Sequence, residues 1–459
     1  MDAKELPPRP RLEQYKKQAK DIVKSKRRSG DNLTLANAQF VIAKEHGFES
    51  WPKFAKHIAA LTRESSTRSL WESAKNALIA GDVSTLDRLL RENEQLFREQ
   101  RPPSYGSGGL APDYSGGDAR SVIVRNHHFE NWAGFAEYME ALHRKNSSVA
   151  QFEAAVDAIV TGDVATLERL LRENPELIRA RSTRAHHATL LHYTGSNGVE
   201  YFRQKTPKNI VRVAEILLQA GAEVDAAADM YGGGSTTLLL VATSIHPFAA
   251  GVLEPLIALL LEHGAAADGP GGRPTVNACL ANGRPRGAEL MAGHGARLDL
   301  EGAAGVGRLD LVRSFFSEDG SLKTSTIRAQ MNNAFAWACQ YGRTSVVDFL
   351  LQRGMQIDAK VPNHGQTGLH WAAYSAHVDT VKLLLERHAP VDAEDETWGN
   401  TPLGWALYGW GHQPTGETPD RYYEVVALLL AAGAVVKAEW LADEDVRADP
   451  RMLAALGVD

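Results

Sequence analysis

The sequence predicts an all-α protein built as a stack of repeated helix pairs, and two internal repeats support this prediction. A long repeat joins "WPKFAKHIAAL" from Trp51 to "WAGFAEYMEAL" from Trp132, and the same offset joins "GDVSTLDRLLREN" from Gly81 to "GDVATLERLLREN" from Gly162. A shorter repeat, "HGQTGLHWAAYSAHVDTVKLLLERHAPVDA" from His364, returns in the segment that follows it. Each copy is expected to bury its apolar face only against adjacent copies.

Residues 1–63 are expected to form a basic helical segment. They contain 14 Lys and Arg against 7 Asp and Glu, which gives them a charge of +7 and leaves −13 for the remainder of a chain whose net charge is −6. The charges in "KKQAKDIVKSKRR" alternate with apolar positions at helical spacing, as is typical of a solvated amphipathic helix. Contact of residues 11–28 with nucleic acid is the alternative, and the acidic remainder argues against it as the main role.

Residues 64–183 are expected to contain duplicated, degenerate helix pairs separated by the Gly- and Pro-rich loop "RPPSYGSGGLAPDYSGG" at 101–117. The chain shows no signal peptide and no stretch long enough to cross a membrane, so no membrane contact is expected. Two cysteines cannot form a disulfide framework in 459 residues, which favours a reducing, cytoplasmic location. We also expect a monomer.

Residues 184–438 contain seven copies of a pattern that is similar to ankyrin repeats. The pattern T-P-L-H-x-A, followed by a Leu-rich second helix, is matched by Thr367, Leu369 and His370 and again by Thr401 and the residues after it. The resemblance implies antiparallel helix pairs with short hairpin or loop fingers, and a role in binding other proteins. It also implies that His192, at the signature His position, is a structural histidine bonded to neighbouring backbone. Residues 439–459 are expected to form a polar helix that caps the last copy.

Three copies carry insertions at equivalent points between their two helices. These are "VEYFRQKTPKN" after Gly198, "PFAAGVL" after His246 and "HQPTGETPDRY" after Gly411. Equivalent points lie on one edge of a repeat stack, so the 199–209 insert is expected to wall a pocket over the ends of the neighbouring first helices. Guanidinium, ammonium, hydroxyl and amide groups suit a carboxylate or phosphate. The predicted anion site comprises Ser196, Asn197, Tyr201, Arg203, Gln204, Lys205, Thr243, Ser244, His246, Asn282 and Arg284.

The 199–209 insert also has a simpler interpretation, and two residues outside it are conditional members of the pocket. Basic residues in such loops are often simply solvated. Thr206 and Pro207 can serve to start the following helix. Asp229 and Tyr231, in the Gly-rich stretch "ADMYGGGSTT", join the pocket only if the insert folds back towards them.

Aromatic residues gather in the C-terminal copies. Trp337, Trp371 and Trp405 occupy equivalent positions, and tyrosines lie nearby. Packing between copies explains the first two tryptophans, whereas a protein-binding surface explains the remainder, because Trp and Tyr supply large contact areas with a polar tip. The predicted partner-binding residues are Tyr341, Tyr374, Trp405, Tyr408 and Trp410.

The leading hypothesis is therefore a scaffold that binds a protein partner on its concave face and needs no cofactor. The rival is an enzyme or sensor of an anionic small molecule, in which Arg203 and Lys205 hold the anion. His246, Tyr201 and Lys205 are then the candidate catalytic groups. The sequence lacks paired-Cys zinc spacing, an H-E-x-x-H helix, a G-x-S-x-G turn and a G-x-G-x-x-G loop, so no metal site is expected.

Overall fold

The structure, a computed structural model, divides into two compact units, Met1–Ala150 and Gln151–Asp459, which are described separately. It describes residues 4, 6–7, 10–28, 33–80, 82–93, 119–144, 146–269, 272, 274–323, 327–361, 365–412 and 419–458. The predicted loop at 101–117 and residues 413–418 of the last insert lie outside the described residues. The predicted boundaries at 63, 183 and 438 remain predictions.

The predicted all-α fold is confirmed, because regular structure in the described residues is helical apart from three isolated β-bridges. None of the described helices combines the length and the apolar character that crossing a lipid bilayer requires.

The N-terminal unit contains two apolar clusters. The first is enclosed by α1 (Leu12–Arg28), α2 (Leu35–Glu45) and the start of α3 (Trp51–Ala80), around buried Tyr15, Ile42 and Phe54. The second joins the end of α3 to three further helices and includes buried Leu86 and Phe135. These helices are α4 (Val83–Glu92), α6 (Ala119–Asn126) and α7 (Trp132–His143).

The long sequence repeat has a structural counterpart in this unit. Phe54 and Phe135, 81 positions apart, are both fully buried, and their rings lie 5.3 Å from His46 and 5.5 Å from His127 respectively. The copies then diverge, because α3 continues as one helix to Ala80 whereas α7 ends at His143 and α8 (Ser148–Thr161) begins anew.

Two residues account for the break between α7 and α8. Asn146 has a φ of 62°, in the left-handed region that Asn tolerates better than most residues. Ser147 then accepts a hydrogen bond from the Ala150 N–H at 3.0 Å and caps the new helix.

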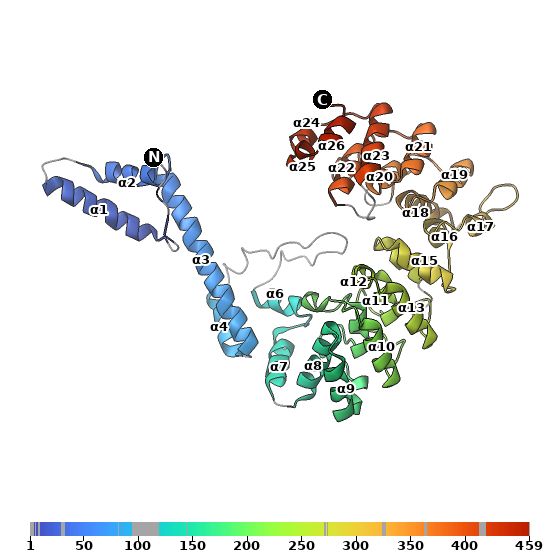
Figure 1. Cartoon of the computed structure of the whole chain (residues 1–459), viewed down its shortest axis with the longest axis horizontal. Helices are drawn as coiled ribbons and strands as arrows, with labels where there is room; N and C mark the ends of the chain where they lie inside the picture. The colour runs from blue at the N-terminus through green and yellow to red at the C-terminus, as the bar shows by residue number, and fades with distance from the viewer. Residues whose placement is uncertain are drawn as a thin grey trace. The chain divides into compact units, whose positions relative to one another are not determined.

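In the C-terminal unit, helices follow one another as pairs, from α8 and α9 to α22 and α23 (Figure 1). Successive first helices from η3 to α22 lie side by side, and second helices pack in the same order over most of this range. The first helices are α8, η3 (Leu190–Gly195), α11 (Thr237–Thr243), α14 (Thr275–Ala281), α16 (Leu300–Gly305), α18 (Ile327–Gln340), α20 (Gly368–Tyr374) and α22 (Pro402–His412). The second helices are α9 (Val164–Glu173), α10 (Ile210–Gln219), α13 (Leu253–Glu262), α15 (Pro285–Gly293), α17 (Leu309–Ser314), α19 (Thr344–Gln352), α21 (Val378–Glu386) and α23 (Pro419–Ala431).

Three short elements lie outside this pairing in the first half of the unit. They are η2 (Pro175–Arg179) after α9, η4 (Tyr201–Arg203) in the first insert and α12 (Ile245–Ala249) in the second. Both inserts therefore contain a short turn of helix.

A Thr–His pair starts two of the first helices and ties each to the next copy. The Thr189 N–H donates to His192 Nδ1 at 3.1 Å, and Thr367 pairs with His370 in the same way. The other ring nitrogen of His192 contacts the carbonyl of Ser235, in the finger of the following copy, at 3.1 Å. Burial lowers the pKa of His192 to about 4, so its ring is neutral at pH 7. The prediction that His192 is structural is confirmed.

Two apolar clusters fill the C-terminal unit, one spanning the pairs from α8 to α15 and the other the pairs from α16 onwards. The last pair is covered by three short helices that bury Val446, Met452 and Leu456. These are α24 (Ala438–Ala442), α25 (Glu444–Ala448) and α26 (Pro450–Ala455), of which the last two are capped by Asp443 and Asp449. Covering the final apolar face is what an array of this kind requires.

Candidate partner-binding surface and anion site

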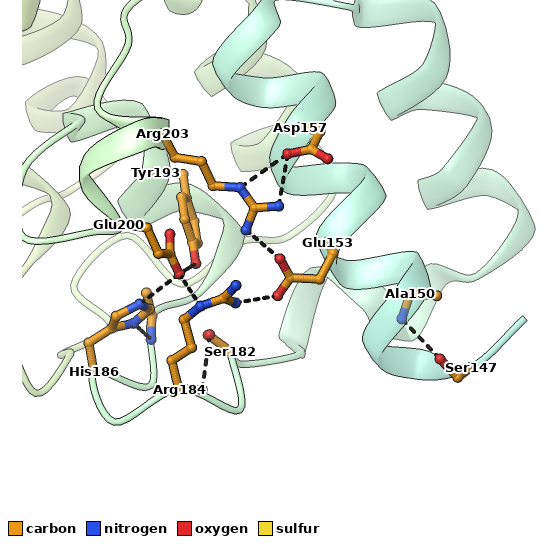
Figure 2. A network of polar contacts seen from close by, with 11 residues as sticks. Ser147, Ala150, Glu153, Asp157, Ser182, Arg184, His186, Tyr193, Glu200 and Arg203 are labelled. Atoms are coloured by element: carbon orange, nitrogen blue, oxygen red, sulfur yellow. Dashed lines mark hydrogen bonds and ion pairs between the residues drawn. The ribbon is translucent and has the colours of Figure 1, made fainter. Parts of the chain in front are cut away.

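A buried network of charged groups holds the insert at 199–209 against α8 (Figure 2). Arg203, at the end of η4, donates to the buried carboxylate of Glu153, and its Nη2 lies 2.8 Å from Asp157 Oδ1. Burial alone would lower the pKa of Arg203, but the charges of Glu153 and Asp157 raise it instead. Arg203 is therefore a fixed cation with two carboxylate partners.

The same network continues to a second arginine. Arg184 Nη1 lies 2.5 Å from Glu153 Oε1, and Arg184 Nε lies 2.6 Å from Glu200 Oε1. Glu200 has no exposed side-chain area and also contacts His186 Nε2 at 3.2 Å and the Tyr193 hydroxyl at 3.3 Å. Burial alone would raise the pKa of Glu200, but the His186 hydrogen bond and the Arg184 charge lower it to about 2. Glu200 is thus ionised, and both Glu200 and Glu153 are paired with guanidinium groups, as buried charges must be.

This arrangement changes the interpretation of the insert. Sequence reasoning placed Arg203 in the wall of an anion pocket, but its side chain is 7% exposed and its guanidinium is bound by carboxylates of α8. Gln204 Nε2 donates to the carbonyl of Val199 at 2.9 Å, and Ser196 Oγ donates to the carbonyl of Lys205 at 2.6 Å. The Lys205 side chain itself is exposed, as is Tyr201 at 70%. The polar groups of the insert therefore bond mainly to the insert itself and to neighbouring residues of the same unit.

The predicted polar ends of the first helices do meet. Asn197 Nδ2 donates to Thr243 Oγ1 at 3.0 Å, which joins two successive copies. Tyr231, from the Gly-rich turn, donates its hydroxyl to Asn197 Oδ1 at 2.7 Å. Ser244 accepts the His246 N–H at 3.2 Å and so begins α12. Asn197 and Thr243 of the predicted anion site therefore form one cluster, and Tyr231, from outside that predicted set, adds its hydroxyl to it.

A second cluster of predicted anion-site residues lies at the start of α15. Burial lowers the pKa of His246, and the nearby positive charge of Arg284 lowers it further. Asn282 is exposed, and its side-chain Nδ2 donates a hydrogen bond to the carbonyl of Ala278 at 2.8 Å. His246 and Arg284 are thus the predicted pair that the structure brings within electrostatic reach of each other.

The C-terminal copies carry a continuous chain of aromatic rings, here called the aromatic surface, which consists of Trp371, Tyr374, Trp398, Trp405 and Tyr408. Trp405 is its centre, with ring centroids 5.1 Å from Trp371, 5.6 Å from Tyr374 and 5.7 Å from Trp398. Tyr374 stacks on Tyr408 at 6.2 Å, and Tyr408 stacks on His412 at 4.0 Å. Trp398 and Tyr408 are 64% and 51% exposed, so both ends of the chain of rings face solvent.

A buried carboxylate supports the centre of this surface. Asp395 accepts the indole N–H of Trp405 at 3.1 Å and the backbone N–H groups of Thr397, Trp398 and Asn400 at 2.7–3.0 Å. Burial alone would raise the pKa of Asp395, but these donors lower it. The finger that carries Trp398 is therefore fixed around an ionised group.

Three of the five predicted partner-binding residues lie in the aromatic surface, and two do not. Tyr341 is 7% exposed and donates its hydroxyl to the carbonyl of Leu280, so it packs between copies. Trp410 is half-buried and packs against the second apolar cluster. Sequence reasoning omitted Trp398, although "ETWGN" places a tryptophan in a finger turn, and it omitted His412.

The basic α1 helix has an ordinary amphipathic structure. Tyr15 and Ala19 are buried on its inner face, and Lys16 pairs with Glu13 at 2.7 Å on its outer face. This is the arrangement expected of a solvated helix that packs on one side.

Comparison with known families agrees with the helix pairs described above. Residues 300–395 and 337–439 match the family described as ankyrin repeats in three copies. These segments cover α16 to α23 and include the whole aromatic surface. None of the curated proteins compared with the chain matches it. The C-terminal part of the chain is an ankyrin repeat array, and the protein is an ankyrin repeat protein.

Proposed function

We propose that the protein binds a protein partner through the aromatic surface of its C-terminal repeats. Ankyrin repeats are generally scaffolds for protein–protein interaction. The observation that supports this particular site is the unbroken chain of rings from Trp398 to Tyr408, exposed at both ends. Binding hot spots are enriched in Trp and Tyr because these residues bury large areas at little entropic cost.

The chemistry of the surface favours a partner segment that presents an arginine or lysine side chain. Aromatic ring faces attract cations, most strongly those of Trp. Asp395 places an ionised carboxylate against the indole N–H of Trp405, which increases the negative potential of that ring. The finger also carries Asp392, as well as Glu394 and Glu396, which pair with Lys437 at 3.8 Å and Lys360 at 3.0 Å respectively.

The rival function, an enzyme or sensor with an anion pocket at the 199–209 insert, has weaker support. Arg203, its main proposed anion ligand, is neutralised by Glu153 and Asp157. Lys205 and Tyr201 are exposed residues of the same insert. His246 and Arg284 remain available for anion binding. The two cysteines, Cys279 and Cys339, are buried and unpaired, which fits the proposed cytoplasmic location.

A photo-crosslinking amino acid at position 408 of the full chain tests the proposed surface. We expect one protein of the source cell to crosslink from position 408 but not from position 201, where a more exposed tyrosine lies outside the surface. Crosslinks that are identical from both positions, or absent from position 408 alone, would contradict the proposal.

A further inference from the structure

In the C-terminal unit, three of the residues that directly precede a second helix make the same kind of contact. The polar side chain of each of these residues contacts a backbone carbonyl at the end of the first helix of the preceding copy. Asn209 Nδ2 donates to the carbonyl of Gly162, and Arg343 Nε donates to that of Gly305, both at 2.9 Å. His377 Nε2 contacts the carbonyl of Gln340, also at 2.9 Å. Helix ends leave carbonyls unpaired, so these side chains satisfy acceptors that the helix cannot.

Arg284 occupies the same position, before α15, but does not make this contact with the preceding copy. Among the residues that the structure describes, its Nη1 donates only to the carbonyl of the adjacent Gly283, at 3.0 Å. Its Nε is buried and finds no hydrogen-bond acceptor among the described residues. Arg308, at the equivalent position before α17, differs because it pairs with Asp310 at 2.7 Å.

The inserted helix α12 explains why Arg284 lacks its usual acceptor. In the uninterrupted copies the first helix ends and exposes a carbonyl to the next copy. Here α11 ends at Thr243, and Ser244 immediately starts α12. The carbonyl of Ala242 is covered as well, because it packs against Gly287, where an added Cβ would collide with it. The insert thus begins directly at the end of α11, and its His246 lies within electrostatic reach of Arg284.

No carboxylate compensates the charge of Arg284 within the described residues. The acidic residue nearest in sequence on α15 is Glu289, which pairs with Arg343 at 2.6 Å and Arg286 at 3.6 Å. The groups that act electrostatically on Arg284 are Tyr341 and Cys279, both of which are neutral at pH 7 because burial raises the pKa of each. Burial also lowers the pKa of Arg284 itself. A half-buried cation of this kind is costly unless it is paired.

We propose that Arg284 anchors a binding site for a small oxyanion, a carboxylate or a phosphate, with His246 of α12 as a second donor. The planar guanidinium offers two or more N–H groups in the geometry that such oxyanions accept. The buried Nε of Arg284 supplies a donor that the protein leaves unused. Binding pairs the charge that the insert left uncompensated.

The test is a titration of the ¹⁵N-labelled full chain at pH 7.5 with inorganic phosphate and, in a second arm, with sodium acetate. Sodium chloride at matched ionic strength serves as the reference. The arginine Nε–H resonance that disappears in the Arg284→Gln variant identifies the site. We expect this resonance to shift saturably with at least one of the two oxyanions and not with chloride. Saturation with phosphate alone identifies a phosphate-type ligand, and saturation with both identifies a general oxyanion site that accepts carboxylates.

Two variants control the titration. Arg286→Gln removes the same charge two residues away, at an exposed arginine that already pairs with Glu254 and Glu289, and should retain the wild-type shift. Arg284→Lys keeps the charge but loses the planar pair of N–H donors, and should weaken binding at least tenfold, as followed in the backbone amide resonance of Gly283 in both proteins. The proposal is overturned if neither oxyanion gives a saturable shift of the Arg284 resonance. Equal weakening in the Arg286→Gln variant would also overturn it.

Discussion

Glu153 of α8 and Arg203 of the insert form a buried ion pair fifty residues apart in sequence. The pair joins the duplicated helical segment to the first copy of the repeat array. Glu153 also pairs with Arg184, so one carboxylate bridges two buried arginines, which are further paired with Glu200 and Asp157 (Figure 2). The insert at 199–209 is, through this contact, part of the structure that joins α8 to the array.

Loss of Glu153 should therefore destabilise the C-terminal unit strongly. Glu153→Ala leaves two buried arginines without their shared partner, and removal of one member of a buried ion pair costs about 3–5 kcal/mol. Asp157→Ala is the matched control, because Asp157 pairs with the same arginine but its side chain is 64% exposed, and it should cost less than about 1 kcal/mol. Urea denaturation measures both free energies of unfolding. Equal losses in the two variants would show that burial of the pair is unimportant.

Acidification should destabilise the same unit through His192. Its pKa is about 4 in the folded chain against an ordinary value of 6.5, so the unfolded chain binds more protons between these two pH values. Stability is therefore full above pH 6.5 and falls as pH decreases towards 4, by on the order of 2–3 kcal/mol. His192→Gln should flatten this dependence in urea denaturation at pH 7 and pH 5. His187→Gln, at an exposed ring, should leave it unchanged. An unaltered pH dependence in His192→Gln would contradict this assignment.

Two glycines of α22 should respond oppositely to alanine. A Cβ at Gly409 would collide with the carbonyl oxygen of Tyr374, so Gly409→Ala must push α22 away from α20. We expect a loss of about 1–3 kcal/mol, typical of overpacking. Gly411→Ala meets no atom within 4 Å and should be neutral or stabilise by up to about 1 kcal/mol. Thermal unfolding of both variants checks this. Similar melting temperatures for the two would mean that α20 and α22 are not held in close contact.

The sequence predicted the repeat architecture well, because helix pairing is a local and periodic property. Trp371 and Trp405 occupy equivalent positions in successive copies, and the structure places their rings 5.1 Å apart. The same alignment of copies also indicates that Tyr341 is buried rather than available to a partner, which the sequence prediction missed. Ser375 and Gly409 occupy the equivalent position in the next copies, and both are small and buried, which marks a position that packs against the preceding copy.

The sequence could not predict the partner of Arg203. Its carboxylates lie on α8, and their proximity depends on how the duplicated helices pack against the array, which no local pattern encodes. The state of Arg284 was hidden for the same reason. Its charge is conspicuous in the sequence, but the missing acceptor becomes visible only beside the equivalent contacts of Asn209 and Arg343.

The affinity of the crosslinked partner for three purified forms of the full chain tests the central claim most directly. Tyr408→Ala shortens the aromatic surface at an exposed end, and loss of a hot spot of about 2 kcal/mol or more weakens binding roughly 30-fold. Tyr201→Ala removes a more exposed tyrosine outside the surface and should stay within about twofold of wild type. Wild-type affinity in Tyr408→Ala, or an equal loss in both variants, would contradict the assignment of partner binding to the aromatic surface.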